Sequence, residues 1–326
     1  MPPLTTLLNL FNDLKADSAS DAHLTTSNAK CEDIEELLER PWFSRRWIVQ
    51  EICNAQEATV MFGTYELSWI DFTGALDTLT SAADDTRALQ KYSAARLMIW
   101  RNGVKVDSVL HAMETFHDFA GTDDRDRVAA FLNLGWPRTS LGSDFVVDYS
   151  HSVDYNYYRF AKHMVDIGKG AEVLVAASYC YRSIEASQGS LPSWVPDWRT
   201  MLRRRIRSSV DGTFNVSIAN GNCLKFSGQI AYVFVADVKD TATGSGTVAE
   251  AQHSQILPRK GDIICRLTAK EGYLDPNGIV LRRYKQSDCF SIVASYLEYY
   301  NLGDADWAAS VSIPEGTQQP QHFLVK

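Results

Sequence analysis

The spacing of apolar and polar residues changes its period near residue 200. Before that point, apolar side chains recur mainly every three or four positions, which is typical of helices with one buried face. After it, apolar and polar residues alternate with period two, which is typical of strands. The pattern therefore predicts an α+β protein. A mainly helical N-terminal half should be followed by a mainly antiparallel β C-terminal half, built as a sheet or small barrel.

The element boundaries follow from this spacing and from the residues that start and end helices. Pro41 is disfavoured inside a helix but accepted in its first turn, so one helix should end at Arg40 and the next begin near Trp42. Ser68 and Asp71 can cap a further helix. The other predicted helices span residues 4–16, 31–40, 42–54, 86–100, 106–119, 121–135 and about 150–167. Strands are expected over residues 58–63, 65–69, 213–218, 224–226, 230–238, 262–267, 279–284 and 290–296.

The helix predicted over residues 42–54 carries the pattern of a buried helix, because apolar residues cover nearly its whole circumference. These residues are Trp42, Phe43, Trp47, Ile48, Val49, Ile52 and Cys53. Glu51 would then lose its hydration, so its carboxylate needs a cation, several hydrogen-bond donors or a proton. Two interpretations stay open, an ion pair within the fold and a functional carboxylate. The candidate cations for the ion pair are Arg40, Arg45 and Arg46.

The same stretch resembles a block of the fungal HET (heterokaryon incompatibility) domain family. That block reads approximately R-P-aromatic-aromatic-x-R-x-W-x-x-Q-E, and a short strand ending in glycine follows it. The strand is matched by residues 58–63. The matching residues of the block are Arg40, Pro41, Trp42, Phe43, Arg45 or Arg46, Trp47, Gln50 and Glu51.

Further blocks downstream also resemble the family. Residues 123–127 are similar to its D-P-R-D-K segment, with Asp124 in place of proline. Residues 148–157 resemble D-Y-S-x-x-V-x-x-x-Y, and residues 191–198 read L-P-S-W-V-P-D-W without a mismatch. Two prolines and two tryptophans in the last block predict a rigid extended segment packed on the core. In the β half, residues 261–265 and 280–282 are similar to the family, whereas Ala294-Ser295 stand where the family has Gly-Glu.

The resemblance implies three regions: a truncated HET-like segment over 1–82, a helical region over 83–200 and an antiparallel β region over 201–326. The family's N-terminal domain is thought to be related to the TIR fold, and in TIR enzymes that split NAD the catalytic carboxylate is a glutamate following a conserved tryptophan. By that resemblance Glu51 is the candidate catalytic residue, with Trp47, Gln50 and Arg45 beside it. The family's first strands have no counterpart in residues 1–39. One wall of a TIR-like pocket would therefore be missing.

The resemblance favours a cytoplasmic HET-like protein of allorecognition and programmed cell death that acts through protein contacts. An enzyme recruited to specialised metabolism is the alternative, with Glu51 performing cyclase-type or isomerase-type acid–base chemistry on a small molecule without a redox step. NAD hydrolysis is the least favoured of the three functions, because the missing strands would form part of the nucleotide pocket. Whether the protein is an enzyme, its oligomeric state, and whether Met1 is the true start of the gene product stay open.

The composition restricts the kinds of partner that the chain can bind. The net charge of −8 argues against nonspecific binding to nucleic acid, and no stretch is apolar for long enough to span a membrane. The six cysteines are far apart and form no C-x-x-C pair, which is typical of reduced thiols in a cytosolic protein. The seven histidines lack metal-ligand spacing. We therefore predict no metal and no cofactor, and expect either a protein partner or a small-molecule ligand.

Four other motifs have structural interpretations. Residues 244–249 fit G-x-G-x-x-A but do not directly follow a strand, so a surface loop is expected. The acidic residues of 123–126 should cap a helix and pair with Arg125 and Arg127. Ser150 and His151 are residue types found in catalytic triads, but sequence neighbours rarely have triad geometry. The basic run over 203–207 is expected to be solvated, with an anionic ligand or partner as the other possibility.

Overall fold

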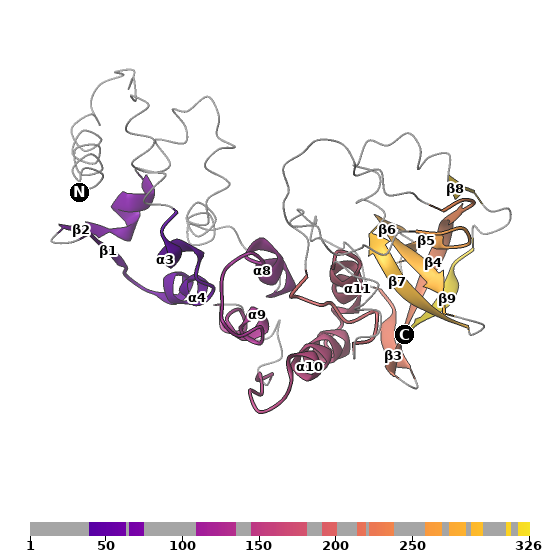
Figure 1. The fold of residues 1–326 in the computed structure, drawn as a ribbon, viewed down its shortest axis with the longest axis horizontal. Coiled ribbons are helices and arrows are strands. Elements are labelled where there is room, and N and C mark those ends of the chain that lie inside the picture. The colour runs from indigo at the N-terminus through magenta and orange to yellow at the C-terminus, as the bar shows by residue number, and fades with distance from the viewer. Residues whose placement is uncertain are drawn as a thin grey trace, which may run out of the picture. The chain divides into compact units, whose positions relative to one another are not determined.

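The chain divides into two compact units, residues 1–137 and 138–326. The computed structural model describes residues 39–62, 65–74, 109–134, 145–180, 191–200, 214–219, 222–237, 258–268, 274–284, 288–295, 311–313 and 319–326 (Figure 1). The division differs from the predicted boundaries at residues 82 and 200. The physical reason is that the helices of residues 153–178 pack against strands of the second unit.

Several predictions concern residues outside these ranges. They are the helices over 4–16 and 86–100, most of the helix over 31–40, the loop at 244–249 and the basic run at 203–207.

In its described residues, the first unit places short helices and a hairpin around an aromatic core. The described elements are α3 (Pro41–Ser44), α4 (Trp47–Asn54), β1 (Thr59–Phe62), β2 (Tyr65–Ser68), a helical segment over 69–74, α8 (Val109–Thr115) and α9 (Asp126–Ala129). β1 and β2 pair in antiparallel fashion, so both predicted extended stretches are confirmed. Ser68 Oγ accepts a hydrogen bond from Asp71 N at 3.0 Å, which confirms the predicted cap of the segment over 69–74. α9 is much shorter than the helix predicted over 121–135.

The single helix predicted over 42–54 is wrong, because the chain leaves helical geometry at Arg45. Pro41 does occupy the first turn of α3, as predicted. Arg45, however, has extended backbone angles of φ −70° and ψ 134°. The backbone around it pairs with a distant residue: Ala120 N donates to Ser44 O at 2.7 Å, and Arg46 N donates to Ala120 O at 2.8 Å. These bonds replace the helical ones, so α3 and α4 are separate helices.

α4 is consequently amphipathic, and the predicted burial around its whole circumference is also wrong. Ile48, Val49 and Ile52 are buried, whereas Glu51 and Asn54 are exposed. The projection counted Trp42 and Phe43 on the same helix, but the break at Arg45 assigns them to α3. Without them, α4 has one apolar face and one polar face.

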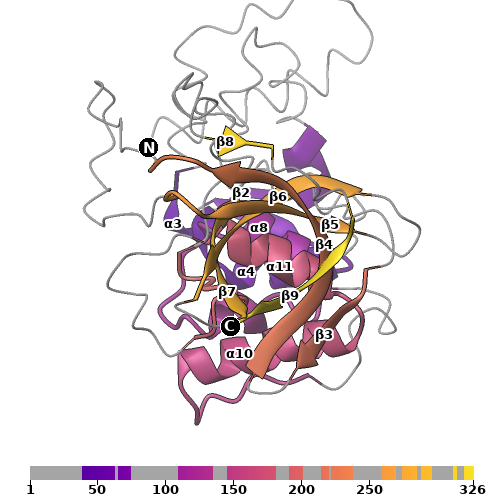
Figure 2. The same ribbon diagram turned by 90° about the vertical axis from the view of Figure 1, so that its right-hand side faces the viewer.

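The described helices of the second unit are α10 (Val153–Asp166) and α11 (Gly170–Ser178). α10 matches its prediction: Ser152 caps it by accepting a hydrogen bond from Tyr155 N at 3.2 Å, and it ends within one residue of the expected boundary. α11 is apolar and almost entirely buried. It contacts β3, β6 and β7, and Figure 2 shows the strands curving around it. None of the helices that the structure describes is both long and apolar enough to cross a membrane.

The described strands of the second unit form one sheet of seven strands. They are β3 (Val216–Ala219), β4 (Cys223–Phe234), β5 (Ile263–Thr268), β6 (Leu274–Arg283), β7 (Cys289–Ser295), β8 (Val311–Ser312) and β9 (Gln321–Val325). β4 is one long strand with a register shift between Ile230 and Tyr232, where two strands were predicted. The pairings run β4-β5-β6-β7-β9 and return from β9 to β4, so these strands close into a ring.

The sheet is mainly antiparallel, as predicted, but it is mixed, because one of its described pairings is parallel. β7 and β9 pair in parallel, with Cys289 opposite Leu324 and Phe290 opposite Val325. The other described pairings of this sheet are antiparallel. The parallel pair is what closes the ring, because β9 inserts between β4 and β7.

The segment over 191–198 packs on the core as predicted, but it folds into turns instead of an extended run. Val195 N donates to Pro192 O at 3.0 Å, which closes one of these turns. Trp194 is fully buried, and its Nε1 donates to Asn222 O at 2.7 Å. Trp198 is also buried, and its ring lies 4.9 Å from that of Tyr157. The turns place both indole rings in the core of the second unit.

Candidate functional site

The predicted site residues lie on or beside α4 in different environments. Trp47 and Gln50 are half-buried, whereas Arg45 and Glu51 are exposed. The expectation that the Glu51 carboxylate loses its hydration is therefore wrong. The break at Arg45 makes α4 a separate amphipathic helix, and Glu51 lies on its exposed face. An ion pair within the fold, with Arg40, Arg45 or Arg46 as the cation, requires a buried Glu51 and loses its basis here. Both interpretations of Glu51 had assumed a buried side chain.

Trp47 is the site residue with a specific long-range contact. Its Nε1 donates a hydrogen bond to Asp126 Oδ2 at 3.0 Å. Asp126 is 9% exposed and lies in the first turn of α9, where a carboxylate also faces the positive end of the peptide dipoles. The contact therefore ties α4 to α9. It also joins two stretches of sequence that both resemble the HET family.

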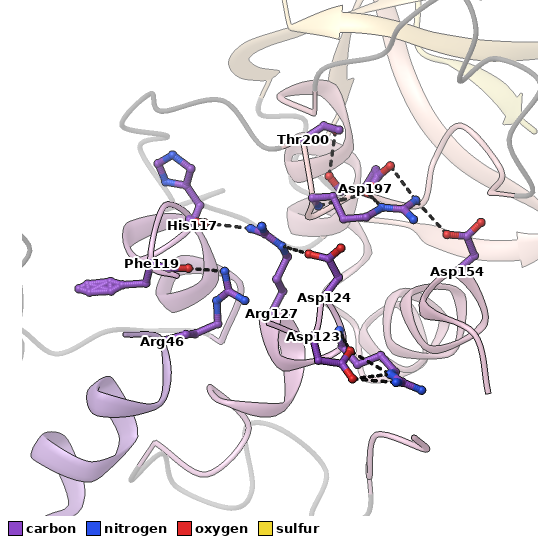
Figure 3. Close-up of polar contacts among 11 residues, drawn as sticks. Arg46, His117, Phe119, Asp123, Asp124, Arg127, Asp154, Asp197 and Thr200 are labelled. Carbon is purple, nitrogen blue, oxygen red and sulfur yellow. Dashed lines mark hydrogen bonds and ion pairs between the residues drawn. The ribbon is translucent and has the colours of Figure 1, made fainter. Parts of the chain in front are cut away.

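Sequence reasoning missed Arg46 as a buried residue. The resembling block fits either Arg45 or Arg46, and only the structure separates them: Arg46 is 2% exposed. Its Nη2 donates to the carbonyl oxygen of Phe119 (Figure 3). A Cβ atom at Gly121 would lie 2.7 Å from Arg46 Nη1, so glycine leaves room for the guanidinium. The break at Arg45 decides which arginine turns inward, and no periodicity in the sequence marks that break.

The acidic residues before α9 pair with neighbouring arginines, as predicted, but the predicted cap is wrong, because the N-cap position holds Arg125 without a side-chain cap hydrogen bond. Arg125 Nη2 donates to Asp123 Oδ2 at 2.7 Å, and Arg127 Nε donates to Asp124 Oδ1 at 2.8 Å. The Arg125 side chain lowers the pKa of Asp123 from its ordinary value. Arg127 Nη1 also donates to His117 O at 3.0 Å, which ties this turn to the end of α8 (Figure 3). These contacts order the turn before α9, and the bond to His117 O connects it to the residues after α8.

Three or more acidic, histidine or cysteine side chains are normally needed to hold a metal ion. No such group occurs among the residues that the structure describes.

In the second unit, Ser150 and His151 do come together with Asp148, but without triad geometry. Ser150 Oγ lies 3.1 Å from His151 Nδ1, and Asp148 Oδ2 lies 2.9 Å from the same nitrogen. A catalytic triad requires the serine and the carboxylate at opposite ring nitrogens. Ser150 Oγ also donates to Asp148 Oδ1 at 2.6 Å, so its hydroxyl serves the carboxylate. The three residues close the loop before α10.

This loop makes a pH-dependent contribution to the stability of the second unit. Hydrogen bonds from the Ser150 side chain and backbone, followed by His151, lower the pKa of Asp148 from 3.8 to about 2. A lowered pKa means that the loop is stabilised above the ordinary pKa and loses this contribution as the pH falls through the folded value. We therefore expect the carboxyl carbon of Asp148 to titrate in an NMR experiment with a midpoint near pH 2.

The variant Asp148→Asn supplies the control for that titration. It should remove the pH dependence of the Ser150 amide signal between about pH 4 and pH 2, because the titrating acceptor is gone. A midpoint for Asp148 near the value of an exposed aspartate would contradict the assigned hydrogen bonds.

A second pair of resembling blocks meets at Arg199. Its Nε donates to Asp197 Oδ1 at 2.7 Å, and its Nη2 lies 2.9 Å from Asp154 Oδ1 in the first turn of α10 (Figure 3). The two carboxylates raise the pKa of Arg199 above its ordinary value, with the Asp197 hydrogen bond as the larger cause. This arginine therefore links the segment over 191–200 to α10.

Comparison with protein-family models, with characterised proteins and with solved structures finds no match to this chain. A function has to be argued from the residues and contacts described above.

Proposed function

We propose that the chain is a fungal HET-like protein of allorecognition and programmed cell death that acts in the cytoplasm through protein contacts. The observation that carries the proposal is the hydrogen bond between Trp47 and Asp126. These residues are separated by 79 positions, and each belongs to a stretch that resembles the HET family. A chance likeness in two separate stretches would give no reason for their matching residues to touch. A shared fold would bring these matching residues into contact.

The contact at Arg199 supports the same proposal in the second unit. It joins the L-P-S-W-V-P-D-W block to the stretch that resembles D-Y-S-x-x-V-x-x-x-Y. Here the contact is made by Arg199, the residue after the block, and by Asp154, which lies within the other stretch.

The surroundings of Glu51 favour protein contacts over catalysis. A general acid or base gains its function from a shielded position near its substrate, and the exposed Glu51 lacks that shielding. The same unit instead exposes large apolar side chains: Trp42 is 39%, Met61 is 66% and Ile70 is 78% exposed. Exposed methionine and aromatic side chains are typical of surfaces that bind other proteins.

The proposal predicts that charged substitutions at these apolar positions reduce cell death. Regulated expression of the chain in a filamentous fungus should kill hyphal compartments, measured by uptake of a vital dye. Met61→Asp and Ile70→Asp should reduce the killed fraction several-fold, because a charge disfavours burial of the surface against a partner. Asn133→Asp adds the same charge at another exposed position of this unit and should leave killing unchanged.

The enzymatic alternatives are tested by the variant Glu51→Gln. Purified wild-type protein and the variant are incubated with NAD, and separately with a fungal metabolite extract, and the species are measured by mass spectrometry. We expect no consumption that depends on Glu51, and unchanged killing by the variant. NAD consumption that needs Glu51 would replace the proposal by NAD hydrolysis, and consumption of another metabolite would replace it by the recruited enzyme.

A further inference from the structure

Two cysteines that are far apart in the sequence meet where β4 and β7 begin. Cys223 is the first residue of β4, and Cys289 is the first residue of β7. Their sulfur atoms lie 3.8 Å apart. Cys223 is buried and Cys289 is half-buried, so Cys289 is the more exposed residue of the pair. None of the five cysteines that the structure describes takes part in a disulfide.

The backbone holds both thiols in place. Asn222, directly before Cys223, has a left-handed φ of 62°, and its carbonyl oxygen accepts the hydrogen bond from Trp194 Nε1. The carbonyl oxygen of Cys289 accepts a hydrogen bond from Tyr284 N at 2.8 Å. β9 runs between the two strands and pairs with both of them. The sulfur atoms are therefore neighbours because of the closed ring of strands.

We propose that Cys223 and Cys289 form a reversible disulfide, and that this thiol pair is an oxidation site for hydrogen peroxide. The sulfur of Cys289, the more exposed residue, attacks one oxygen of the peroxide, water leaves, and Cys289 becomes a sulfenic acid. The Cys223 sulfur then attacks the Cys289 sulfur, and a second water leaves as the S–S bond forms. Two thiols and one peroxide give one disulfide and two waters. The sulfur pair loses two electrons, and the peroxide accepts them.

The order of the two steps follows from the surroundings of the thiols. Burial raises the pKa of Cys223, and its hydrogen bond with Cys289 adds to that effect. Because the thiolate is the reactive form, Cys223 reacts slowly with peroxide and acts as the resolving thiol. Disulfides in a reducing compartment are mostly transient and redox-sensing, which fits a reversible bond. The bond would link β4 to β7 across the end of β9.

Peptide mapping of the oxidised full chain tests this inference. The reduced protein is treated with a small excess of hydrogen peroxide, the remaining thiols are blocked with N-ethylmaleimide, and the chain is digested with trypsin without reduction. Trypsin places Cys223 in the peptide 208–225 and Cys289 in the peptide 286–326. We expect these two peptides to appear as one linked species that dithiothreitol separates. The melting temperature should rise by roughly 5–10 °C on oxidation.

Two variants control the experiment, which is independent of the proposed role in cell death. Cys53→Ser removes another half-buried thiol and should leave the linked species unchanged. Cys289→Ser should abolish the link and leave Cys223 largely unoxidised. Oxidation of Cys289 to a sulfinic acid without a link would overturn the inference, and so would links to Cys53 in similar amounts. The mapping of the wild-type chain decides the matter even if a variant fails to fold.

Discussion

Replacing Trp194 by alanine should lower the free energy of unfolding of the second unit by about 3–5 kcal/mol. The side chain is fully buried, so its removal leaves a cavity as large as an indole ring. It also removes the hydrogen bond from Nε1 to Asn222 O. Urea denaturation followed by circular dichroism measures the loss, since the signal does not depend on the tryptophan that is removed.

Two matched variants separate the causes of that loss. Trp194→Phe keeps an aromatic ring but removes the donor, so it should cost clearly less than the alanine variant. Trp42→Ala removes a tryptophan that is 39% exposed and should cost about 1 kcal/mol or less. An alanine variant at position 194 with the urea midpoint of the wild type would show that the L-P-S-W-V-P-D-W block is not part of the core.

Local signals predicted much of the second unit. The stretch over 148–157 and the helical spacing after it mark α10 within a few residues of its observed bounds, and period two locates most of the strands. β9 was missed because it is short and begins with the exposed polar residues Gln321 and His322. Its parallel pairing with β7 depends on contacts between distant segments. Such contacts close the ring but leave no periodic mark in the sequence.

The same reason explains the errors at the candidate site. Treating residues 42–54 as one helix places Glu51 inside, whereas the pairing of the backbone with Ala120 breaks the helix at Arg45 and leaves Glu51 in water. The ion pairs of Asp123 and Asp124 were predictable because their partners lie two or three residues away. The contact between Cys223 and Cys289 was not predictable, because it depends on how the sheet closes.

Replacing Arg46 by alanine should destabilise the first unit by about 2–4 kcal/mol, although its neighbour Arg45 has the same chemistry. Arg46 is 2% exposed and donates to Phe119 O, so the alanine variant loses packing and leaves that oxygen without its donor. Hydrogen exchange of the full chain, followed by mass spectrometry, should show faster exchange over residues 41–54 and 116–131. Both segments are held by the pairing around Ala120.

Arg45→Ala is the matched control, because it removes the same side chain from an exposed position one residue earlier. Its effect should stay within about 0.5 kcal/mol, with exchange like that of the wild type. A larger loss at Arg45 than at Arg46 would reverse the assignment of the inward-facing arginine. The arginine of the resembling block fits either position, so the two variants also decide which one carries its structural role. An outcome in favour of Arg46 would mean that this arginine anchors the break between α3 and α4, while Arg45 stays on the surface beside Glu51.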